Sequence, residues 1–518
     1  MLFVSNPFLF LFLPVAVIGY QLLSRFGRNA MLAWLTATSL FFYGYWNPAY
    51  LILLCGSIAM NFLFSLRLVE NRPEASRSRW LTIAIIANLG LLAYFKYLFP
   101  VLNFMHRYRV LPHSFVDVML PLGISFFTFT QIAYLIDLRQ DVAKPQGILP
   151  YSVFVTLFPH LIAGPIIHPR ELMPQLEQGR IGPIRSDNLA LGLTWFILGM
   201  GKKILIADRL APLPDLLYAH PHEAGVATAW LGAICYNFQL YFDFSGYSDM
   251  ALGLARIFGI EFPINFHSPY KSQGFIEFWG RWHMTLSRYI NAYLFTPIVQ
   301  GIQGWRAVRG LKNNRATVLT LPGFASLVAT PTLLTMFLAG VWHGAGLQFL
   351  CFGVLHGIYL TINHAWRLLT PEGSRLHRKV PPAFMVMLTF LGFIVTEVFF
   401  RADRVHDAVY VLGTLIGLHH GPGFHGFQYL AELPSTSSFL GDAAKTTAAI
   451  CCCFFIVWAL PNTQEMLDQI PHDQVRLPSI LPQLRWRISM VWSFGVAALF
   501  CISLLLLDGK ARFLYFQF

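Results

Sequence analysis

Residues 336–346 read Met-Phe-Leu-Ala-Gly-Val-Trp-His-Gly-Ala-Gly and place one titratable side chain, His343, at the end of a long apolar stretch. The stretch begins near Ser326 and is apolar enough to lie in a bilayer. An ionisable residue at that depth is costly and is by default a candidate functional residue. Because burial disfavours the imidazolium ion, we expect a buried, neutral imidazole that can act as a general base. The alternative is a structural hydrogen bond to a backbone carbonyl or to another helix.

The composition of the chain indicates a membrane protein. Of its 518 residues, 56% are hydrophobic and 12% are charged, whereas about 25% are charged in soluble domains. We therefore predict an all-α polytopic membrane protein with roughly eleven transmembrane helices plus re-entrant and interfacial helices. Apolar stretches of suitable length begin at Pro7, Ala30, Tyr50, Trp80, Val118, Leu189, Ala227, Ser326, Leu347, Ala383, Ala443 and Ile488.

Basic residues in the early loops predict the orientation in the membrane. Arginines occur in the first and third loops, which the positive-inside rule makes cytoplasmic, so the N-terminus is expected outside. They are Arg25, Arg28, Arg67, Arg72, Arg77 and Arg79. The net charge of +12 fits anionic lipid headgroups and a phosphate-bearing substrate, and it requires no nucleic acid. The seven cysteines lie in apolar segments without metal-type spacing, so no metal site is expected.

An interrupted apolar stretch covers residues 151–175. Within it, residues 158–165 read Phe-Pro-His-Leu-Ile-Ala-Gly-Pro, and the prolines and glycine prevent a spanning helix. Irregular backbone at membrane depth survives only when it is buried in protein or lines a wet cavity. We therefore predict a re-entrant element near a site, in which His160 either lines the cavity or makes a structural contact.

Two further stretches place charges at or near membrane depth. Lys202 and Lys203 end a span, either as snorkelling anchors or as a basic rim that attracts phosphate. Asp243 and Asp249 lie in the aromatic stretch 236–249, so they are expected to face the protein interior and to orient His or Arg partners.

Residues 277–293 fit a helical period. Trp279, Trp282, His283, Leu286, Ile290 and Tyr293 share one face, with Glu277, Arg281 and Arg288 on another. The spacing predicts an amphipathic interfacial helix, an i, i+4 ion pair between Glu277 and Arg281, and a buried His283. His283 is then either a second catalytic histidine or a satisfied core residue.

Two further features lie outside these stretches. His356 follows His343 by 13 residues, so on one continuous helix the two would face nearly opposite ways and could not form a local metal pair. The tail, residues 513–518, has four aromatic residues in six. It reads either as an interfacial aromatic anchor or, through Tyr515, as a functional segment.

Five motifs in order resemble the membrane-bound O-acyltransferase family, in particular its bacterial branch for alginate O-acetylation and teichoic acid D-alanylation. The motifs are residues 158–165, Gly201-Lys202-Lys203 with Ala207-Asp208, residues 241–249, Phe278-Trp279 with Arg281-Trp282-His283, and Trp342-His343-Gly344. The similarity covers about residues 3–400. Two departures, Gly280 in place of Arg and Asn291-Ala292 in place of Arg-Asp, put local substrate or partner contacts in doubt.

The resemblance implies a division into N-terminal transmembrane helices (1–150), a catalytic core (151–402) and C-terminal helices with a loop and aromatic tail (403–518). It also implies a central funnel that receives acetyl-CoA or a similar acyl donor, with no cofactor. His343 matches the catalytic histidine and His283 the second one. The motifs make Lys202, Lys203, Asp243, Asp249, Arg281, Trp282, Trp342 and His160 candidate substrate-binding residues. Asn237, Gln239 or backbone amides are candidate oxyanion donors.

The resemblance also gives Tyr515 a role as an acyl relay, because a tyrosyl ester keeps much of the transfer potential of a thioester. The implied function is an O-acetyltransferase of the bacterial inner membrane that serves an exported polysaccharide through a periplasmic acyltransferase. Alternatives are D-alanyl transfer to a cell-wall polymer and a non-catalytic export scaffold or transporter. A lipid acyltransferase with a His-x4-Asp pair is disfavoured, since none of the 17 histidines has Asp five residues later.

Overall fold

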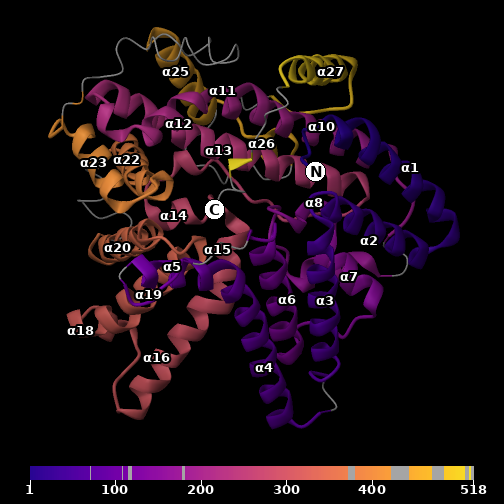
Figure 1. Ribbon diagram of the computed structural model, residues 1–518, viewed down its shortest axis with the longest axis horizontal. Coiled ribbons are helices and arrows are strands. Elements are labelled where there is room, and N and C mark those ends of the chain that lie inside the picture. Colours follow the sequence, from indigo (N-terminus) through magenta and orange to yellow (C-terminus); the bar gives the residue numbers. More distant parts are fainter. Residues whose placement is uncertain are drawn as a thin grey trace. The chain divides into compact units, whose positions relative to one another are not determined.

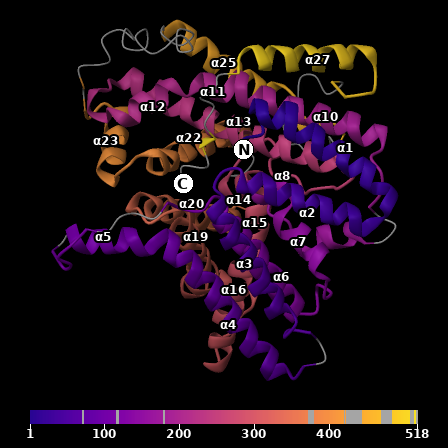
Figure 2. The ribbon, with the colours of Figure 1, turned by 45° about the vertical axis from the view of Figure 1, so that its right-hand side comes forward.

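Every regular element in the described part of the chain is a helix. In hydrocarbon the backbone N–H and C=O groups must find partners within the protein, and a helix supplies them locally. The computed structural model describes residues 1–69, 72–107, 109–114, 119–177, 181–370, 380–419, 421, 443–468, 484–507 and 513–514. Figures 1 and 2 show the helices in two views. The predicted all-α class is therefore confirmed.

The chain divides into two units. Unit 1 contains residues 1–201, 246–264 and 488–517, and unit 2 contains residues 202–245, 265–487 and 518. The long helix α13 (Val226–Ile257) contributes residues to both. The division into 1–150, 151–402 and 403–518 stays a prediction.

Unit 1 is built mainly from the N-terminal helices, with short π or 3₁₀ segments labelled η. They are η1 (Phe8–Phe12), α1 (Leu13–Leu23), η2 (Ser24–Phe26), α2 (Arg28–Gly44), α3 (Pro48–Ser65), α4 (Glu74–Ala93), η3 (Tyr94–Leu98), α5 (Phe99–Arg107), α6 (Ile124–Arg139), α7 (Ile148–Thr156), α8 (Phe158–Leu161), α9 (Pro169–Leu172), η4 (Met173–Leu176), α10 (Ser186–Gly201) and α27 (Met490–Leu505). In both views α3, α4 and α6 lie side by side.

Unit 2 holds the remaining helices. They are η5 (Lys202–Ala207), α11 (Asp208–Leu210), α12 (Pro212–Ala219), η6 (Pro221–Glu223), η7 (Pro269–Lys271), α14 (Phe275–Trp279), α15 (Met284–Ile290), η8 (Asn291–Phe295), α16 (Thr296–Val308), α17 (Arg315–Val318), α18 (Leu321–Phe324), η9 (Ala325–Ala329), α19 (Thr330–His343), α20 (Leu347–Leu369), α22 (Pro382–Arg401), α23 (Val405–Leu415), α25 (Ala443–Ala459) and α26 (Thr463–Met466).

Six helical stretches in the described residues are long and apolar enough to cross a membrane. They are Phe8–Phe26, Pro48–Ser65, Glu74–Arg107, Ser186–Leu210, Leu321–His343 and Pro382–Arg401. Two shorter apolar helices, Ala444–Ala459 and Met490–Leu505, add to them. The larger number expected from sequence includes α2 and α6, which have 17 and 16 residues. The chain is a multi-pass membrane protein.

The segment predicted to be re-entrant is interrupted and buried in unit 1. The short helices α7, α8 and α9 alternate with irregular backbone, and residues 150–169 are buried throughout. Within unit 1, Phe158 packs edge-on against Phe12 and Phe258, with ring centroids 5.2 and 6.0 Å apart. The interrupted backbone and its burial agree with the prediction, whereas a re-entrant position near a site stays a prediction.

Some of the arginines used to predict orientation have structural roles. Arg77 lies in α4, is buried, and pairs with Asp141 at 2.5 Å. Its guanidinium also donates to the carbonyls of Leu68, Leu138 and Arg139. Arg77 therefore fixes the start of α4 to the end of α6 and is not a solvated loop charge.

Aromatic side chains form the core of unit 2 around α14 and α22. Phe278 stacks on Trp282 at 5.7 Å, and both rings contact Phe393 at 4.5 and 5.1 Å. Tyr270 meets Phe390 edge-on at 5.1 Å. Aromatic pairs of this kind contribute about 0.5–1.5 kcal/mol each beyond buried area. They hold the segment that carries His283 against α22.

The helices α19 and α20 approach through two glycines, and both views show them side by side. A Cβ on Gly353 would lie 2.3 Å from the Met336 carbonyl and 2.9 Å from the Cα of Gly340. Small residues permit this close packing where lipid offers no hydrophobic drive for association. The glycines thereby set the positions of the ends of α19 and α20 that flank His343.

We expect Gly353→Ala to lower the free energy of unfolding by about 1–3 kcal/mol, because the added methyl forces two backbones apart. Thermal unfolding in detergent measures the change. Gly301→Ala in α16 is the matched control, since nothing lies within 4 Å of its Cβ position. Equal unfolding midpoints for the two variants would contradict the expectation.

Candidate active site

His283 is held by two chain segments that pair through backbone hydrogen bonds. The amide of His267 donates to the carbonyl of Arg281, and the amide of Met284 donates to the carbonyl of Asn265, both at 2.9 Å. The His283 side chain is 2% exposed and meets Phe244 of α13 edge-on at 4.7 Å. The predicted burial of His283 is confirmed.

The contacts of Asn265 define the tautomer of His283. Asn265 Oδ1 accepts from the Thr285 hydroxyl at 2.8 Å and from the Thr285 backbone amide at 3.3 Å. A backbone amide can only donate, so the atom facing it is the Asn265 oxygen. His283 Nδ1 lies 3.0 Å from the same oxygen and must donate its proton there. In a neutral ring, Nε2 then carries the lone pair.

The backbone at His283 is left-handed, with φ 44° and ψ 49°. Outside glycine this conformation costs on the order of 1 kcal/mol and is found where the surrounding structure requires it. Here it ends the turn after α14 and starts α15. The prediction of one continuous amphipathic helix over 277–293 is therefore wrong.

The break changes which side chains are buried. Phe278, Trp282, Leu286 and Tyr289 are buried, whereas Trp279 and Ile290 are partly exposed. The π-helix η8 follows from Asn291 and shifts the register again. A helical period assumes the same rotation at every residue. Neither the left-handed residue His283 nor the π-helix η8 keeps that rotation.

The predicted ion pair between Glu277 and Arg281 is confirmed. Arg281 Nη2 lies 3.0 Å from Glu277 Oε1, and Nη1 donates to the His267 carbonyl at 3.2 Å. Arg281 is only 8% exposed. Its guanidinium therefore helps to fix the turn before His283, and Trp282 is part of the aromatic core.

His343 is the last residue of α19, and extended backbone at Gly344 ends the helix. The ring sits among Trp342, Phe400 and Phe352, with centroids 4.6, 5.0 and 5.5 Å away. The expectation of full burial is wrong, because the side chain is partly exposed at the helix end. The imidazole is therefore surrounded by aromatic rings but is not fully enclosed.

The sequence suggests His356 only as a possible metal partner of His343 and does not predict its contacts with aromatic side chains. The helix stops at His343 and α20 begins at Leu347, so the two histidines belong to different helices. Both contact Phe352, at 5.5 and 4.6 Å. Trp279 Nε1 donates to His356 Nδ1 at 3.3 Å. Contacts thus run from His343 through His356 to Trp279, four residues before His283.

A buried ion triad joins η5, α11 and α13. Lys203 Nζ lies 2.6 Å from Asp208 Oδ1 and 2.5 Å from Asp243 Oδ1. Lys203 and Asp243 are 4% and 1% exposed. The sequence predicts Lys203 to be either a snorkelling anchor or part of a basic rim. Both predictions are wrong, because its ammonium group is buried. Lys202 beside it is partly exposed.

Asp243 and Asp249 are both buried, as predicted. Asp243 pairs with Lys203, and Asp249 Oδ1 accepts from the Trp195 indole at 3.3 Å, while the predicted His or Arg partners stay a prediction. Asp249 and Trp195 belong to unit 1, whereas Asp243 belongs to unit 2. Among the candidate oxyanion donors, Asn237 donates through Nδ2 to the Ala233 carbonyl.

His160 lies in α8 of unit 1 and is 4% exposed. Its ring meets Phe262 edge-on at 5.6 Å and hydrogen-bonds to the backbone of Phe154. Nε2 has no hydrogen-bond partner in the described residues. These contacts fit the structural interpretation and leave one ring nitrogen for a ligand.

A cavity of about 210 Å³ in unit 2 lies beside Trp279. The hydroxyls of Thr332 and Thr335 in its lining are buried without partners in the described residues. Asn291, one of the two departures from the family pattern, also lines it. The other lining residues are Ser287, Ile290, Phe295, Met336, Leu360 and His364. The other departure, Gly280, is exposed after α14.

Tyr515 lies outside the described residues. Phe513, two residues before it, is 4% exposed and packs on Tyr247 with centroids 4.4 Å apart. Tyr247 in turn stacks on Phe3 at 4.7 Å. Phe513 therefore packs inside unit 1, and the interpretation of the tail as an interfacial aromatic anchor stays a prediction.

The apolar spanning helices define a multi-pass membrane protein, and its enclosed histidines are candidate catalytic residues. A family model described as MBOAT, the membrane-bound O-acyltransferase family, matches residues 81–309, which include His283. The chain belongs to this family and is an acyltransferase.

Several curated proteins are similar over the whole chain. A peptidoglycan O-acetyltransferase from Helicobacter pylori is 37% identical over 558 residues, covering 100% of this chain and 98% of the relative. A protein from Pseudomonas putida, named as probable alginate O-acetylase AlgI, is 34% identical over 530 residues and 100% of both chains. A teichoic acid D-alanyltransferase from Bacillus subtilis is 29% identical over 48% of this chain and 60% of its own.

We expect Asn265→Ala to lower acyl transfer by about 10²-fold, the cost of misplacing a catalytic group by roughly 1 Å. The change removes the acceptor that holds the His283 ring. Asn265→Asp is the conservative control, because it keeps an oxygen acceptor for Nδ1–H. The measurement is the acyl-transfer rate of membranes with matched amounts of each variant. A rate within twofold of wild type for Asn265→Ala would contradict this role.

Stability should fall on acidification. Burial lowers the pKa of His283 to about 3 and that of His160 to about 4, from 6.5. Protons therefore bind more readily to the unfolded chain. The stability contribution is complete above pH 6.5 and is lost as the pH falls toward 4, by up to ~1.4 kcal/mol per pH unit for each histidine. Unfolding in detergent at pH 7.5 and 5.0 measures it.

The control for this pH dependence is His283→Asn, which tolerates the left-handed backbone and does not titrate. Its stability should fall less steeply with acid than that of wild type. Identical slopes would assign the acid sensitivity to other groups.

Proposed function

We propose that this chain is an O-acetyltransferase that passes an acyl group from a cytoplasmic donor, acetyl-CoA or a similar thioester, across the bacterial inner membrane. The acyl group is destined for hydroxyls of an exported polysaccharide. The full-length similarity to proteins named for alginate and peptidoglycan acetylation supports this acceptor class. The D-alanyltransferases match only about half of the chain, which makes D-alanyl transfer the weaker alternative.

The observation that carries the proposal is the fixed tautomer of His283. A neutral imidazole that donates from Nδ1 to Asn265 has its acceptor nitrogen at Nε2, which can orient a donor group of a reactant. His343, in its partly open aromatic box, is the second imidazole of the site. We assign the proton abstraction to His343 and the orientation of a reactant to His283.

The reaction then runs in two steps. The acceptor hydroxyl attacks the thioester carbonyl while its proton moves to the imidazole of His343. The tetrahedral intermediate collapses, the carbon–sulfur bond breaks, and the leaving thiolate takes the proton back. The acetyl ester forms without net change in the histidine.

Tyr515 is the proposed acyl relay toward a periplasmic acyltransferase. In this version its phenol is the acceptor hydroxyl, and the resulting aryl ester passes the acetyl group on. Burial of the preceding Phe513 and Leu514 supports a tail that is anchored to the protein. We also propose that Lys202 and Trp342 bind substrate and that the protein contacts membrane lipids.

We expect His343→Ala to lower the acyl content of the exported polymer by 10²-fold or more, about the contribution of a general base. Polymer yield should not change at matched membrane levels of the protein. Polymer hydrolysis followed by acetate quantification measures the content. Full acylation would contradict the catalytic role of His343. Loss of polymer export would instead favour the non-catalytic scaffold alternative.

Tyr515→Phe tests the relay in the same assay, because it removes only the hydroxyl. Loss of acylation together with intact binding of the donor supports the relay. Normal acylation would assign the tail a purely structural role.

A further inference from the structure

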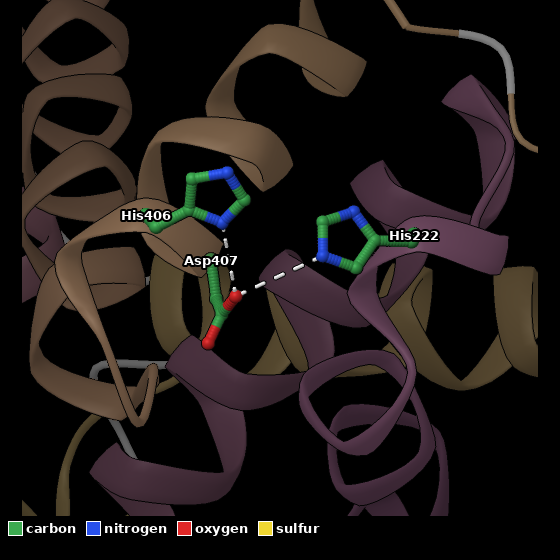
Figure 3. Close-up of side chains that lie close together, drawn as sticks. All are labelled: His222, His406 and Asp407. Atoms are coloured by element: carbon green, nitrogen blue, oxygen red, sulfur yellow. Dashed lines mark hydrogen bonds and ion pairs between the residues drawn. The ribbon is translucent and has the colours of Figure 1, made fainter.

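Three possible metal ligands meet on the surface of unit 2, away from the histidines described above. His222 Nε2 lies 3.8 Å from Asp407 Oδ1, and His406 Nδ1 lies 3.4 Å from the same oxygen. One ligand atom from each of the three residues lies within 4.8 Å of the others. Figure 3 shows both imidazole rings directed at the carboxylate.

The three residues come from two elements that contact each other. His222 is in η6, next to Pro221, whereas His406 and Asp407 are in the first turn of α23. The His222 ring packs edge-on against Tyr410 of α23, with centroids 4.1 Å apart. This contact restricts the ring before any ligand binds.

The spacing is compatible with ligands of one metal ion. His406 Nδ1 and Asp407 Oδ1 make a long hydrogen bond of 3.4 Å, whereas the 3.8 Å between His222 Nε2 and the same oxygen exceeds hydrogen-bond distance. Two ligands about 2.0–2.1 Å from a tetrahedral Zn²⁺ lie roughly 3.3–3.4 Å apart. The His406–Asp407 distance of 3.4 Å matches this spacing, and the three ligand atoms, all within 4.8 Å of one another, have to draw closer around a bound ion.

We propose that His222, His406 and Asp407 bind a divalent transition cation, with Zn²⁺ as the ion that fits their chemistry. Two neutral imidazoles and one carboxylate form a common three-residue zinc set, and water completes the tetrahedron. His222 and His406 are exposed and Asp407 is partly exposed, so the ion exchanges with solvent. The expectation of no metal site rested on the cysteines and did not consider histidines distant in sequence.

The bound ion would tie η6 to α23 within unit 2. The helix α13, which carries Asp243, begins three residues after η6 ends, and α22, which carries Phe400, ends four residues before α23 begins. The ion therefore joins the chain segments adjoining two helices that contribute to the site. This role is independent of the proposed acyl donor and acceptor.

The test uses the purified full-length chain in detergent, without a histidine tag, and Zn²⁺ as the probe. Calorimetric titration should give a saturable site of about one ion per chain. His222→Ala and Asp407→Ala should each weaken binding at least tenfold. His220→Ala is the matched control, because His220 is exposed, lies two residues from His222 and is not one of the three ligands. Equal affinity in His222→Ala and wild type would overturn the proposal.

Cobalt spectroscopy on the wild-type chain keeps the test decisive if a variant does not fold. Co²⁺ bound at this site should show visible bands of a tetrahedral nitrogen and oxygen set, and Zn²⁺ should abolish them. A thiolate-to-cobalt band would place the ion on cysteine and overturn the assignment. An absence of bands together with no calorimetric signal would do the same.

Discussion

A backbone in hydrocarbon has no solvent partner for its N–H and C=O groups, and this constraint shapes the described parts of both units. It explains why every regular element there is a helix, and why the irregular stretch around α8 is enclosed by other residues. It also explains the glycine contact between α19 and α20, since helices in lipid associate through close packing. The candidate catalytic residue His343 ends a helix whose position this packing fixes.

Charges in this environment require partners, and the protein supplies them inside each unit. Lys203 pairs with two carboxylates. Arg77 pairs with Asp141 and donates hydrogen bonds to three backbone carbonyls. Removing Asp243 from the buried Lys203–Asp243 pair leaves an uncompensated charge, which costs far more than the intact pair contributes. Motif residues of this kind therefore hold helices together, and a role in substrate binding is additional to that task.

The sequence predicted much of the helical framework because hydrophobic length is a local property. Expected starts such as Leu189, Ala383 and Leu347 lie within three residues of the starts of α10, α22 and α20. The Glu277–Arg281 pair was predictable for the same reason. Its i, i+4 spacing spans the end of α14, where the chain still turns as a helix.

The site itself was only partly predictable. The pattern over 277–293 identified a buried His283 but not the left-handed residue that splits the helix, since periodicity carries no information about a single dihedral angle. The Trp279–His356 hydrogen bond joins residues 77 positions apart, and no local spacing reveals it. Those contacts depend on how α14 and α20 pack, which is decided by the aromatic core.

At position 283 the left-handed backbone and the proposed role in acyl transfer favour different residues. Glycine and asparagine adopt this conformation at lower cost than histidine, yet neither offers an imidazole. Selection for stability alone would therefore replace the ring, whereas under the proposed function selection for acyl transfer would retain it. A screen for stabilised variants should keep position 283 unchanged, because a substitution that relieves the backbone there removes the imidazole to which the proposal assigns a role.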